Sequence, residues 1–311
     1  MVSTLFVQRQ LNYVQEEVVT QDFPELLMTS GTVLPISTEL PSGAQTYTYK
    51  LLTFVGSAAI LAAGTDDIPL VNAYAEERTG YIRTLVSGFE YSIEDLEAAE
   101  FNNRNIDTQL AIGAREIVEQ EFDAIAYEGS PQHNLQGFLN HPNVSSETVL
   151  NDGNENGGTN STRWIHKTPE QIYRDLRSFA SAKRIASKYT QKPQAIALPS
   201  EAYEIILGTP YPTGSTSGST ILSFFLGTQR LSPDGIQSVF PAPYLDDKGV
   251  GGAGMMVSFR KRADKIKLHM AMDFSMLPVQ MINFCYRVPV RMRTGAVQIL
   301  KPMSVHYGYG I

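Results

Sequence analysis

The sequence predicts an α+β fold that combines an N-terminal arm, a long β-hairpin, one long helix and a second α+β layer. Three observations support this fold class. Residues 44–54, AQTYTYKLLTF, alternate polar and apolar side chains with the period of a strand. Residues 105–128 instead place apolar side chains at helical spacings. A helix, a strand and another helix then follow within residues 168–207, which indicates a layer with its own core.

The composition is typical of a folded protein without a membrane segment. The 311 residues are 42% hydrophobic and 18% charged, and their formal net charge is −7. No apolar run approaches the roughly 20 residues of a membrane helix, and the first residues lack the order of a signal peptide. Cys285 is the only cysteine, which excludes an intrachain disulfide and a thiolate-rich zinc site. We therefore expect no membrane partner and no cofactor.

The first ninety residues predict an arm followed by a hairpin. Prolines and a glycine interrupt residues 1–43, which favours an extended arm. The alternating strand that begins at Ala44 is followed by small residues at 56–69 and by a second extended run at 80–92. We expect these runs to pair as a hairpin. Such a hairpin has too small a core to be stable alone, so it should lie on something else.

The long helix should be the spine of the fold. Ser92 and Asp95 form a capping-box variant that begins a short helix before it. Gly129 ends the long helix in the position that a helix C-terminus prefers, and Pro131 prevents its continuation. The helical spacing predicts one buried stripe, formed by Ile106, Leu110, Gly113, Ile117 and Ala124.

Three carboxylates, Glu116, Glu119 and Asp123, share a face of this helix outside the predicted stripe. We expect them to point outward, and because like charges at i, i+4 repel, we expect a basic group beside them. A catalytic acid would need an apolar enclosure that shifts its pKa, and the sequence supplies none. His133 and His141 have no third ligand at a useful spacing, so neither a catalytic residue nor a metal site is expected.

The second half of the chain predicts a further helix and the closing strands. Thr168 is the expected N-cap of a helix whose buried face would be Ile172, Leu176, Phe179 and Ile185. The glycine-rich run at 249–254 lacks the Lys-Ser/Thr pair of a P-loop, so nucleotide binding is not expected. Strand-like runs fill the last sixty residues and should return the chain to a sheet that packs on the long helix.

The charge is unevenly distributed along the chain. Lys50 is the only lysine before residue 167, whereas residues 259–267 and 287–293 are rich in basic side chains. Opposite charges in the two halves suit contacts between copies of one chain. Solvated faces of different sign would explain the same pattern equally well.

Two runs of sequence, and the order of the parts, resemble a known family. Residues 121–142, EFDAIAYEGSPQHNLQGFLNHP, end in a Gly-apolar-apolar-Asn-x-Pro turn, and residues 192–207, KPQAIALPSEAYEIIL, read as a strand and a helix. Both are similar to parts of the major capsid proteins of tailed bacteriophages with the HK97-type fold. The first resembles the end of that family's spine helix, and the second resembles its apical domain. The resemblance covers nearly the whole chain.

The resemblance implies a non-enzymatic major capsid protein that forms pentamers and hexamers of an icosahedral phage head. Its partners would be other copies of the chain, double-stranded DNA on the inner face, and separate scaffolding, portal and decoration proteins. Its location would be the virion, after assembly in the host cytoplasm. The implied parts are an N-terminal arm at 1–43, an extended loop at 44–91, a peripheral domain at 92–145 and 271–311, and an axial domain at 146–270.

The resemblance also suggests which residues touch a neighbouring subunit. The candidates are Lys50, Glu116, Glu119, Asp123, Arg260, Lys261, Arg262, Arg291 and Arg293. The founding member of the family crosslinks a lysine of its extended loop to an asparagine elsewhere; here Lys50 lies in the predicted hairpin and Asn283 lies near the closing strands. A salt bridge or solvent contact of Lys50 is the simpler interpretation. An encapsulin-like shell around a protein cargo is the alternative function, and a hydrolase is a third.

Overall fold

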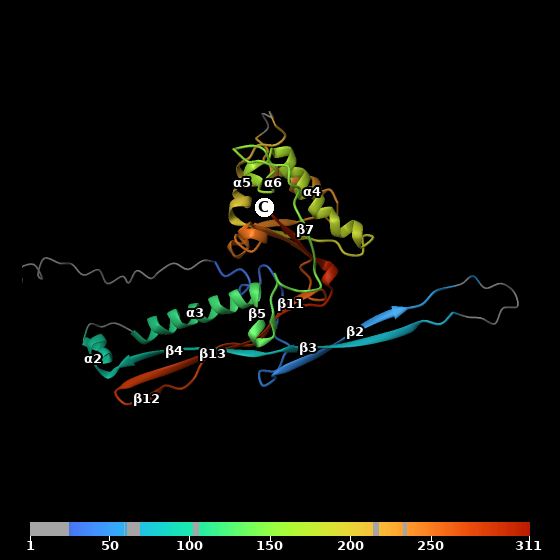
Figure 1. Ribbon diagram of the computed structural model, residues 1–311. Helices are drawn as coiled ribbons and strands as arrows, with labels where there is room; N and C mark the ends of the chain where they lie inside the picture. Colours follow the sequence, from blue (N-terminus) through green and yellow to red (C-terminus); the bar gives the residue numbers. More distant parts are fainter. Residues whose placement is uncertain (1–24, 59, 61–68, 102–105, 214–217, 233–234) are drawn as a thin grey trace, which may run out of the picture.

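The computed structural model describes residues 25–58, 60, 69–101, 106–213, 218–232 and 235–311. Two β-sheets, each covered by helices, form the body, and a hairpin extends away from it (Figure 1). This α+β architecture confirms the predicted fold class. The predicted arm at residues 1–24 and most of the predicted hairpin tip, residues 61–68, lie outside the described residues.

The first sheet supports the long helix. Its strand order is β1-β11-β13-β12, and β4 pairs with β13 as well. β1 is parallel to β11, and the other pairs are antiparallel. The bounds are β1 Ile36–Ser37, β4 Arg83–Ser92, β11 Ile266–Met276, β12 Gln280–Ile282 and β13 Cys285–Ile299.

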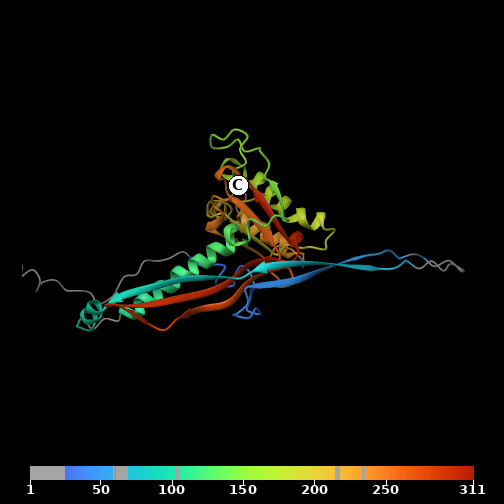
Figure 2. The same ribbon diagram turned by 60° about the horizontal axis from the view of Figure 1, so that its bottom comes forward.

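The long helix α3 (Ile106–Glu128) follows the short helix α2 (Ile93–Phe101) and lies along this sheet in both views (Figures 1 and 2). The predicted stripe is wrong at Ile117, which is 55% exposed. The sequence has apolar residues at neighbouring helix positions, so periodicity alone allows two stripes about 100° apart. The side chain of Ile106 lies outside the described part. The buried face consists of Ala114, Val118, Phe122, Ile125 and Ala126.

The predicted helix ends are confirmed. The backbone N–H of Asp95 donates to Ser92 Oγ at 3.0 Å, and the backbone N–H of Ser92 donates to Asp95 Oδ2 at 3.1 Å. Gly129 ends α3 with a φ of 72°, a conformation that glycine adopts without strain. Gly137 packs on the Gly129 backbone, where a Cβ would overlap main-chain atoms. Its N–H donates to Asn140 Oδ1 at 2.9 Å. The Gly-apolar-apolar-Asn-x-Pro turn therefore folds back on the helix end.

The hairpin pairs β2 (Thr46–Val55) with β3 (Asn72–Tyr81) over ten residues. The prediction that residues 80–92 form its return strand is wrong, because β4 pairs with β13 of the first sheet instead. The true return strand is largely polar, and a strand that is exposed on both faces needs no apolar alternation. Within the described residues the hairpin joins neither large sheet.

The second sheet has the strand order β7-β14-β10-β8-β9. Its bounds are β7 Ser145–Thr148, β8 Ala195–Leu198, β9 Ser238–Pro241, β10 Met255–Phe259 and β14 Val305–Tyr309. The prediction that the last strands all return to the sheet under the long helix is wrong for β10 and β14, which pair with each other in the second sheet. The chain thus crosses between the two sheets three times, at residues 129–144, 260–265 and 300–304.

Three helices, α4 (Pro169–Ala186), α5 (Ser200–Gly208) and α6 (Ile221–Arg230), complete the second layer. Thr168 caps α4 as predicted, in a reciprocal pair with Gln171. Ile172, Leu176 and Phe179 are buried, but the prediction that Ile185 joins them is wrong, since it is exposed in the last turn of α4.

Candidate functional site

The hairpin carries a group of exposed large apolar side chains. Phe54 is 69% exposed and Leu52 is 60% exposed. We call this group the hairpin surface, which comprises Leu52, Phe54, Val55, Leu70, Val71 and Tyr74. Exposed apolar surface of this kind marks a site of contact with another molecule. Our sequence analysis missed these residues. The available signal was LLTFV, where apolar residues occupy both faces of one strand, as in strands that are covered on both sides.

A second exposed apolar group lies at the other end of the body, where α2 and β12 meet the start of β13 (Figure 1). We call it the tip surface. It comprises Phe101, Met276, Val279, Met281, Ile282 and Phe284. The backbone N–H of Ile93 donates to the carbonyl of Phe284 at 3.1 Å, which fixes α2 beside this turn. The molecule therefore has apolar surfaces at both ends of its long dimension.

Asp123 points into the protein, so its predicted outward orientation is wrong. Its side chain is 0% exposed, because the stripe that faces the sheet is displaced from the predicted one. Asp123 Oδ1 accepts hydrogen bonds from the backbone N–H groups of Met28 and Thr29, both at 2.9 Å, and from Thr29 Oγ1 at 3.2 Å. Burial raises the pKa of Asp123, although these hydrogen bonds oppose the shift. Asp123 thus fastens the chain near residue 28 to α3.

The other two carboxylates of the predicted face remain partly exposed. Glu119 accepts from Arg115 Nε at 2.6 Å, one helical turn away. Glu116 is half-buried, and no ion pair among the described residues includes it. The three acids thus differ in their surroundings. Asp123 is buried and hydrogen-bonded, Glu119 pairs with Arg115, and Glu116 is available for a partner.

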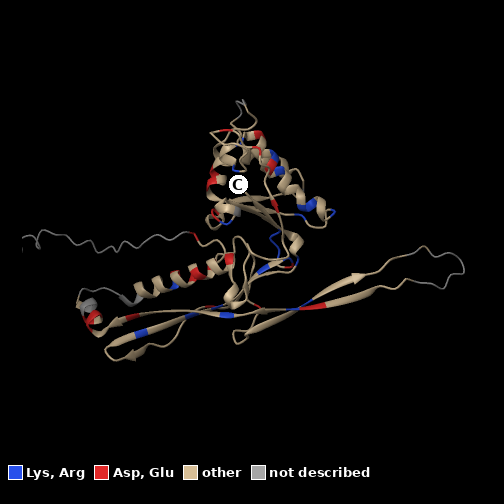
Figure 3. Ribbon diagram, viewed as in Figure 1, with Lys and Arg blue, Asp and Glu red and all other residues tan. Residues whose placement is uncertain are grey.

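The basic candidates mostly have partners within the chain. Lys50 Nζ lies 3.1 Å from Glu77 Oε1 across the hairpin, and both side chains are exposed. This is the simpler of the two roles considered for Lys50. Arg262 Nε lies 3.1 Å from Asp264 Oδ1. Figure 3 shows acidic and basic residues interspersed along the described part of the chain.

The remaining basic residues support the chain before the hairpin. Lys261 Nζ donates to the carbonyl of Thr32. Arg293 donates to the carbonyls of Ser42 and of Ala44, the latter at 2.8 Å. Buried nitrogens without a hydrogen-bond partner among the described residues include the Nε atoms of Arg260, Arg291 and Arg293. No ion pair among the described residues includes Arg260 or Arg291, so the guanidinium groups of both remain available.

The two histidines of the turn after α3 differ in their exposure to solvent. His141 is buried, its Nδ1 accepts from the backbone N–H of Asn143 at 3.3 Å, and burial lowers its pKa. His133 is exposed. Among the described residues, no group of three or more His, Cys, Asp or Glu side chains could hold a metal ion. In the same part of the chain, no helix combines the length and apolar character needed to cross a membrane.

Comparisons with known proteins agree on one architecture. A family model described as "Major capsid protein" matches residues 56–311. The capsid of Myoviridae phage XM1 is 16% identical, with 97% of this chain and 98% of that chain covered and a TM-score of 0.76. A chain of Mycobacterium phage Bobi is 12% identical, with coverages of 99% and 98% and a TM-score of 0.62. A virus-like particle from Pyrococcus furiosus is 12% identical, with coverages of 91% and 95% and a TM-score of 0.57. No curated protein sequence matches.

Proposed function

The chain belongs to the major capsid protein family and has the HK97-type fold, and from this premise we propose that it assembles into pentamers and hexamers of an icosahedral phage head. The head would enclose double-stranded DNA. In this proposal the first sheet with α3 forms the peripheral part of each subunit, and the second sheet with α4, α5 and α6 forms the axial part. The subunit then resides in the virion after assembly in the host cytoplasm.

The hairpin surface is the observation that carries the proposal. A two-stranded hairpin without a core is marginal in water, yet this one presents Phe54 and Leu52 to solvent. Fully burying one such side chain contributes roughly 1.5–3 kcal/mol. Contact with a neighbouring subunit would supply that burial for every copy in a shell. The hairpin surface and the tip surface differ from each other, so contacts through them would be heterologous and suited to rings.

The spine acids and the basic residues of another copy form a second proposed contact. Among the described residues, Glu116 is the candidate acid that is neither paired nor buried, and Arg260 and Arg291 are the candidate bases whose side chains have no partner within the chain. Of the two possible pairs we propose Glu116 with Arg291. We expect Glu116→Arg to reduce the yield of shells several-fold, since it sets two cations in one contact. Combining it with Arg291→Glu should restore most of that yield, as measured by particle counts in negative-stain microscopy. A double variant no better than Glu116→Arg alone would exclude this pairing.

Microscopy of the purified chain tests the proposed function directly. The chain is expressed alone, passed through a size-exclusion column, imaged in negative stain, and measured by absorbance at 260 and 280 nm. We expect closed shells or rings of capsomers. Copurified nucleic acid would support a phage head, whereas a copurified protein cargo would support the encapsulin-like alternative. A monomer that stays monomeric when it is mixed with candidate scaffolding proteins would contradict the proposal. Portal and decoration proteins are further partners in this proposal.

A further inference from the structure

A buried lysine of the second layer lacks the carboxylate partner that such a group normally has. Lys183 lies on α4 and is 6% exposed. No ion pair among the described residues includes it, and its Nζ donates instead to Ser145 Oγ on β7. Lysine is almost never this deeply buried without an ionic partner. An ionisable group in such an environment, in contact with a hydroxyl, is a candidate for chemistry.

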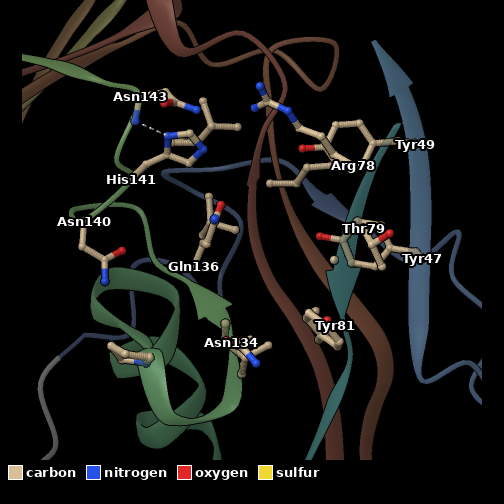
Figure 4. Close-up of a pocket in the computed structure, with 17 residues that line it drawn as sticks. Tyr47, Tyr49, Arg78, Thr79, Tyr81, Asn134, Gln136, Asn140, His141 and Asn143 are labelled. Atoms are coloured by element: carbon tan, nitrogen blue, oxygen red, sulfur yellow. Dashed lines mark hydrogen bonds between the residues drawn. The ribbon is translucent and has the colours of Figure 1, made fainter. Parts of the chain in front are cut away.

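Ser145 is the first residue of β7 and is exposed. The turn that leads to it is fixed by hydrogen bonds. The N–H of Asn143 donates to His141 Nδ1 at 3.3 Å, and the N–H of Val144 donates to the carbonyl of His141 at 3.2 Å. Figure 4 shows His141 and Asn143 in this turn, where they line a cavity of about 610 Å³ beside the hairpin base. Ser145 is thus held in a defined position while it remains accessible to a reactant.

His306 on β14 contacts Ser145 twice. Its Nδ1 lies 2.9 Å from the carbonyl oxygen of Ser145 and 3.3 Å from Ser145 Oγ. A carbonyl oxygen can only accept a hydrogen bond, so Nδ1 carries the proton of the neutral ring and donates it. The other ring nitrogen, Nε2, lies 3.3 Å from Glu147 Oε2, and the ring stacks on Phe179 with centroids 5.0 Å apart. His306 therefore orients Ser145, but its Nδ1 cannot accept the hydroxyl proton.

Lys183 is the group that can accept the proton of Ser145. Burial lowers the pKa of Lys183, and the carboxylate of Glu147 opposes part of this shift. The amine therefore loses its proton at a lower pH than the amine of an exposed lysine. Once neutral, Nζ has a lone pair that can accept a hydrogen bond from the Ser145 hydroxyl. A serine in hydrogen-bond contact with a base is the arrangement that makes its oxygen a nucleophile.

The backbone beside Ser145 is open to a further strand. Within the described residues, β7 is an edge strand of the second sheet and pairs only with β14. The N–H of Val149 donates to the carbonyl of Tyr309 at 3.0 Å, toward β14. Backbone groups alternate in direction along a strand, so those of Ser146 and Thr148 point away from β14. An extended peptide can pair with this free edge, which would bring one of its carbonyl groups beside Ser145.

We propose that Ser145 and Lys183 form a nucleophile and base pair that cleaves an extended peptide bound along the free edge of β7. Lys183 accepts the proton of Ser145 as Oγ attacks a peptide carbonyl carbon, and the free N–H groups of the edge can donate to the carbonyl oxygen as charge develops on it. The C–N bond then breaks, the proton passes from Lys183 to the leaving nitrogen, and the acyl group stays on Ser145 as an ester. Water attacks this ester with Lys183 as base, which releases the carboxylic acid and returns the proton to Ser145. All the groups belong to one chain, so the reaction does not depend on shell assembly.

Labelling with a fluorophosphonate tests the nucleophile. In this reaction Ser145 Oγ attacks phosphorus, the P–F bond breaks, fluoride leaves, and Lys183 takes the hydroxyl proton. The purified full-length chain is incubated with a biotin-linked fluorophosphonate and digested, and the modified serines are quantified by mass spectrometry. A positioned base contributes roughly a hundredfold or more to such a step. We therefore expect Ser145 to be labelled at least tenfold faster than any other serine.

Four variants separate the roles of the groups, with circular dichroism as the check of folding. Lys183→Met removes the amine but fills a similar volume, and labelling of Ser145 should fall at least tenfold. His306→Ala should also slow labelling, and His306→Asn, whose amide can donate in place of Nδ1, should restore part of the rate. The matched control is Ser146→Ala. Ser146 is exposed on the same strand, but its side chain points to the opposite face, so labelling of Ser145 should stay within about twofold.

The unmodified chain supplies a measurement that does not depend on how a variant folds. The labelling rate at Ser145 should rise with pH and level off below the pKa of about 10.4 of an exposed lysine, because Lys183 is a base only when it is neutral and burial lowers its pKa. Incubation with a library of unstructured peptides should give cleavage products that Ser145→Ala abolishes. Equal labelling of other serines, undiminished labelling of Lys183→Met, or a rate that rises without levelling off would overturn the nucleophile and base pair. Labelling without cleavage of any peptide would overturn the assignment of peptides as the substrate.

Discussion

Replacement of Phe54 by aspartate should abolish shell formation and leave the subunit folded. Phe54 is 69% exposed near the end of β2, so the substitution removes little packing within one chain. In a shell, the same position would lose roughly 2 kcal/mol of apolar burial and would place an unpaired charge in a contact, which costs more. Because every subunit carries the change, we expect shell yield to fall at least tenfold. Size-exclusion chromatography and negative-stain microscopy measure the yield, and circular dichroism measures the fold.

The control for this variant is Thr48→Asp in the same strand. Thr48 is exposed nearer to the hairpin base, opposite Thr79. The substitution therefore adds the same charge outside the hairpin surface. Its shell yield should stay within about twofold of the unmodified chain. Normal shells from Phe54→Asp, or equal losses from both variants, would remove the hairpin surface from the proposed contact.

Removal of the Asp123 carboxylate should release the described start of the chain from α3. Asp123→Ala eliminates three hydrogen bonds and leaves the N–H groups of Met28 and Thr29 without an acceptor. Unsatisfied buried donors cost roughly 1–3 kcal/mol each, and the lost desolvation penalty of the carboxylate offsets part of this. We expect the free energy of unfolding to fall by about 2–4 kcal/mol. Hydrogen exchange at Met28 and Thr29 should accelerate more than exchange in the second sheet.

Two substitutions serve as controls for Asp123→Ala. Asp123→Asn retains a side-chain oxygen at the Oδ1 position and should lose less stability. Glu121→Ala changes an exposed carboxylate of the same helix and should change stability by less than about 0.5 kcal/mol. If Asp123→Ala were as stable as Glu121→Ala, the buried hydrogen bonds would not be what holds residues 28 and 29.

The difference in stability between the unmodified chain and Asp123→Asn should depend on pH. Burial raises the pKa of Asp123 in the folded chain above the value of about 3.9 of an unfolded aspartate. The folded state therefore binds the proton more tightly. Relative to Asp123→Asn, which does not titrate, the stability of the unmodified chain should be greatest below about pH 3.9 and should decline as pH rises through the folded pKa. A stability difference that rises with pH would contradict the direction of this shift.

Local features of the fold were predictable from the sequence. The capping pair of Ser92 and Asp95, the glycine at the end of α3 and the cap at Thr168 are decided by neighbouring residues. Their hydrogen bonds span three or four residues, so the sequence contains both partners. The order of these features also predicted the family correctly.

Features that depend on distant partners were not predictable in the same way. Whether Ile117 or Val118 faces the sheet depends on where β13 and β4 lie, and helical spacing allows either. β4 pairs with a strand about two hundred residues later, a choice that no local pattern records. The polar sequence of β3 hid the true return strand of the hairpin, because a strand without a buried face lacks the alternation that identifies strands.

The candidate contact residues show the same difference between what neighbouring residues decide and what distant partners decide. The sequence places Asp123 among the exposed acids because it lies outside the predicted apolar stripe. The stripe that the structure buries is a different one, and Asp123 is buried beside it. Met28 and Thr29, its partners, lie some ninety-five residues earlier and carry no motif. The hairpin surface could have been predicted from LLTFV, since consecutive apolar residues in a strand indicate that both faces are covered.

The length of β13 has a mechanical consequence. The strand has fifteen residues and is therefore about 50 Å long at the usual rise per residue. It begins at the tip surface and ends where the chain crosses to the second sheet. If the subunit is pulled along this strand, the load runs parallel to it, whereas its ladder hydrogen bonds with β4 and β11 run across it. Such a load shears many bonds at once instead of peeling them one after another. The strand is thus suited to carry tension between the tip surface and the crossing to the second sheet.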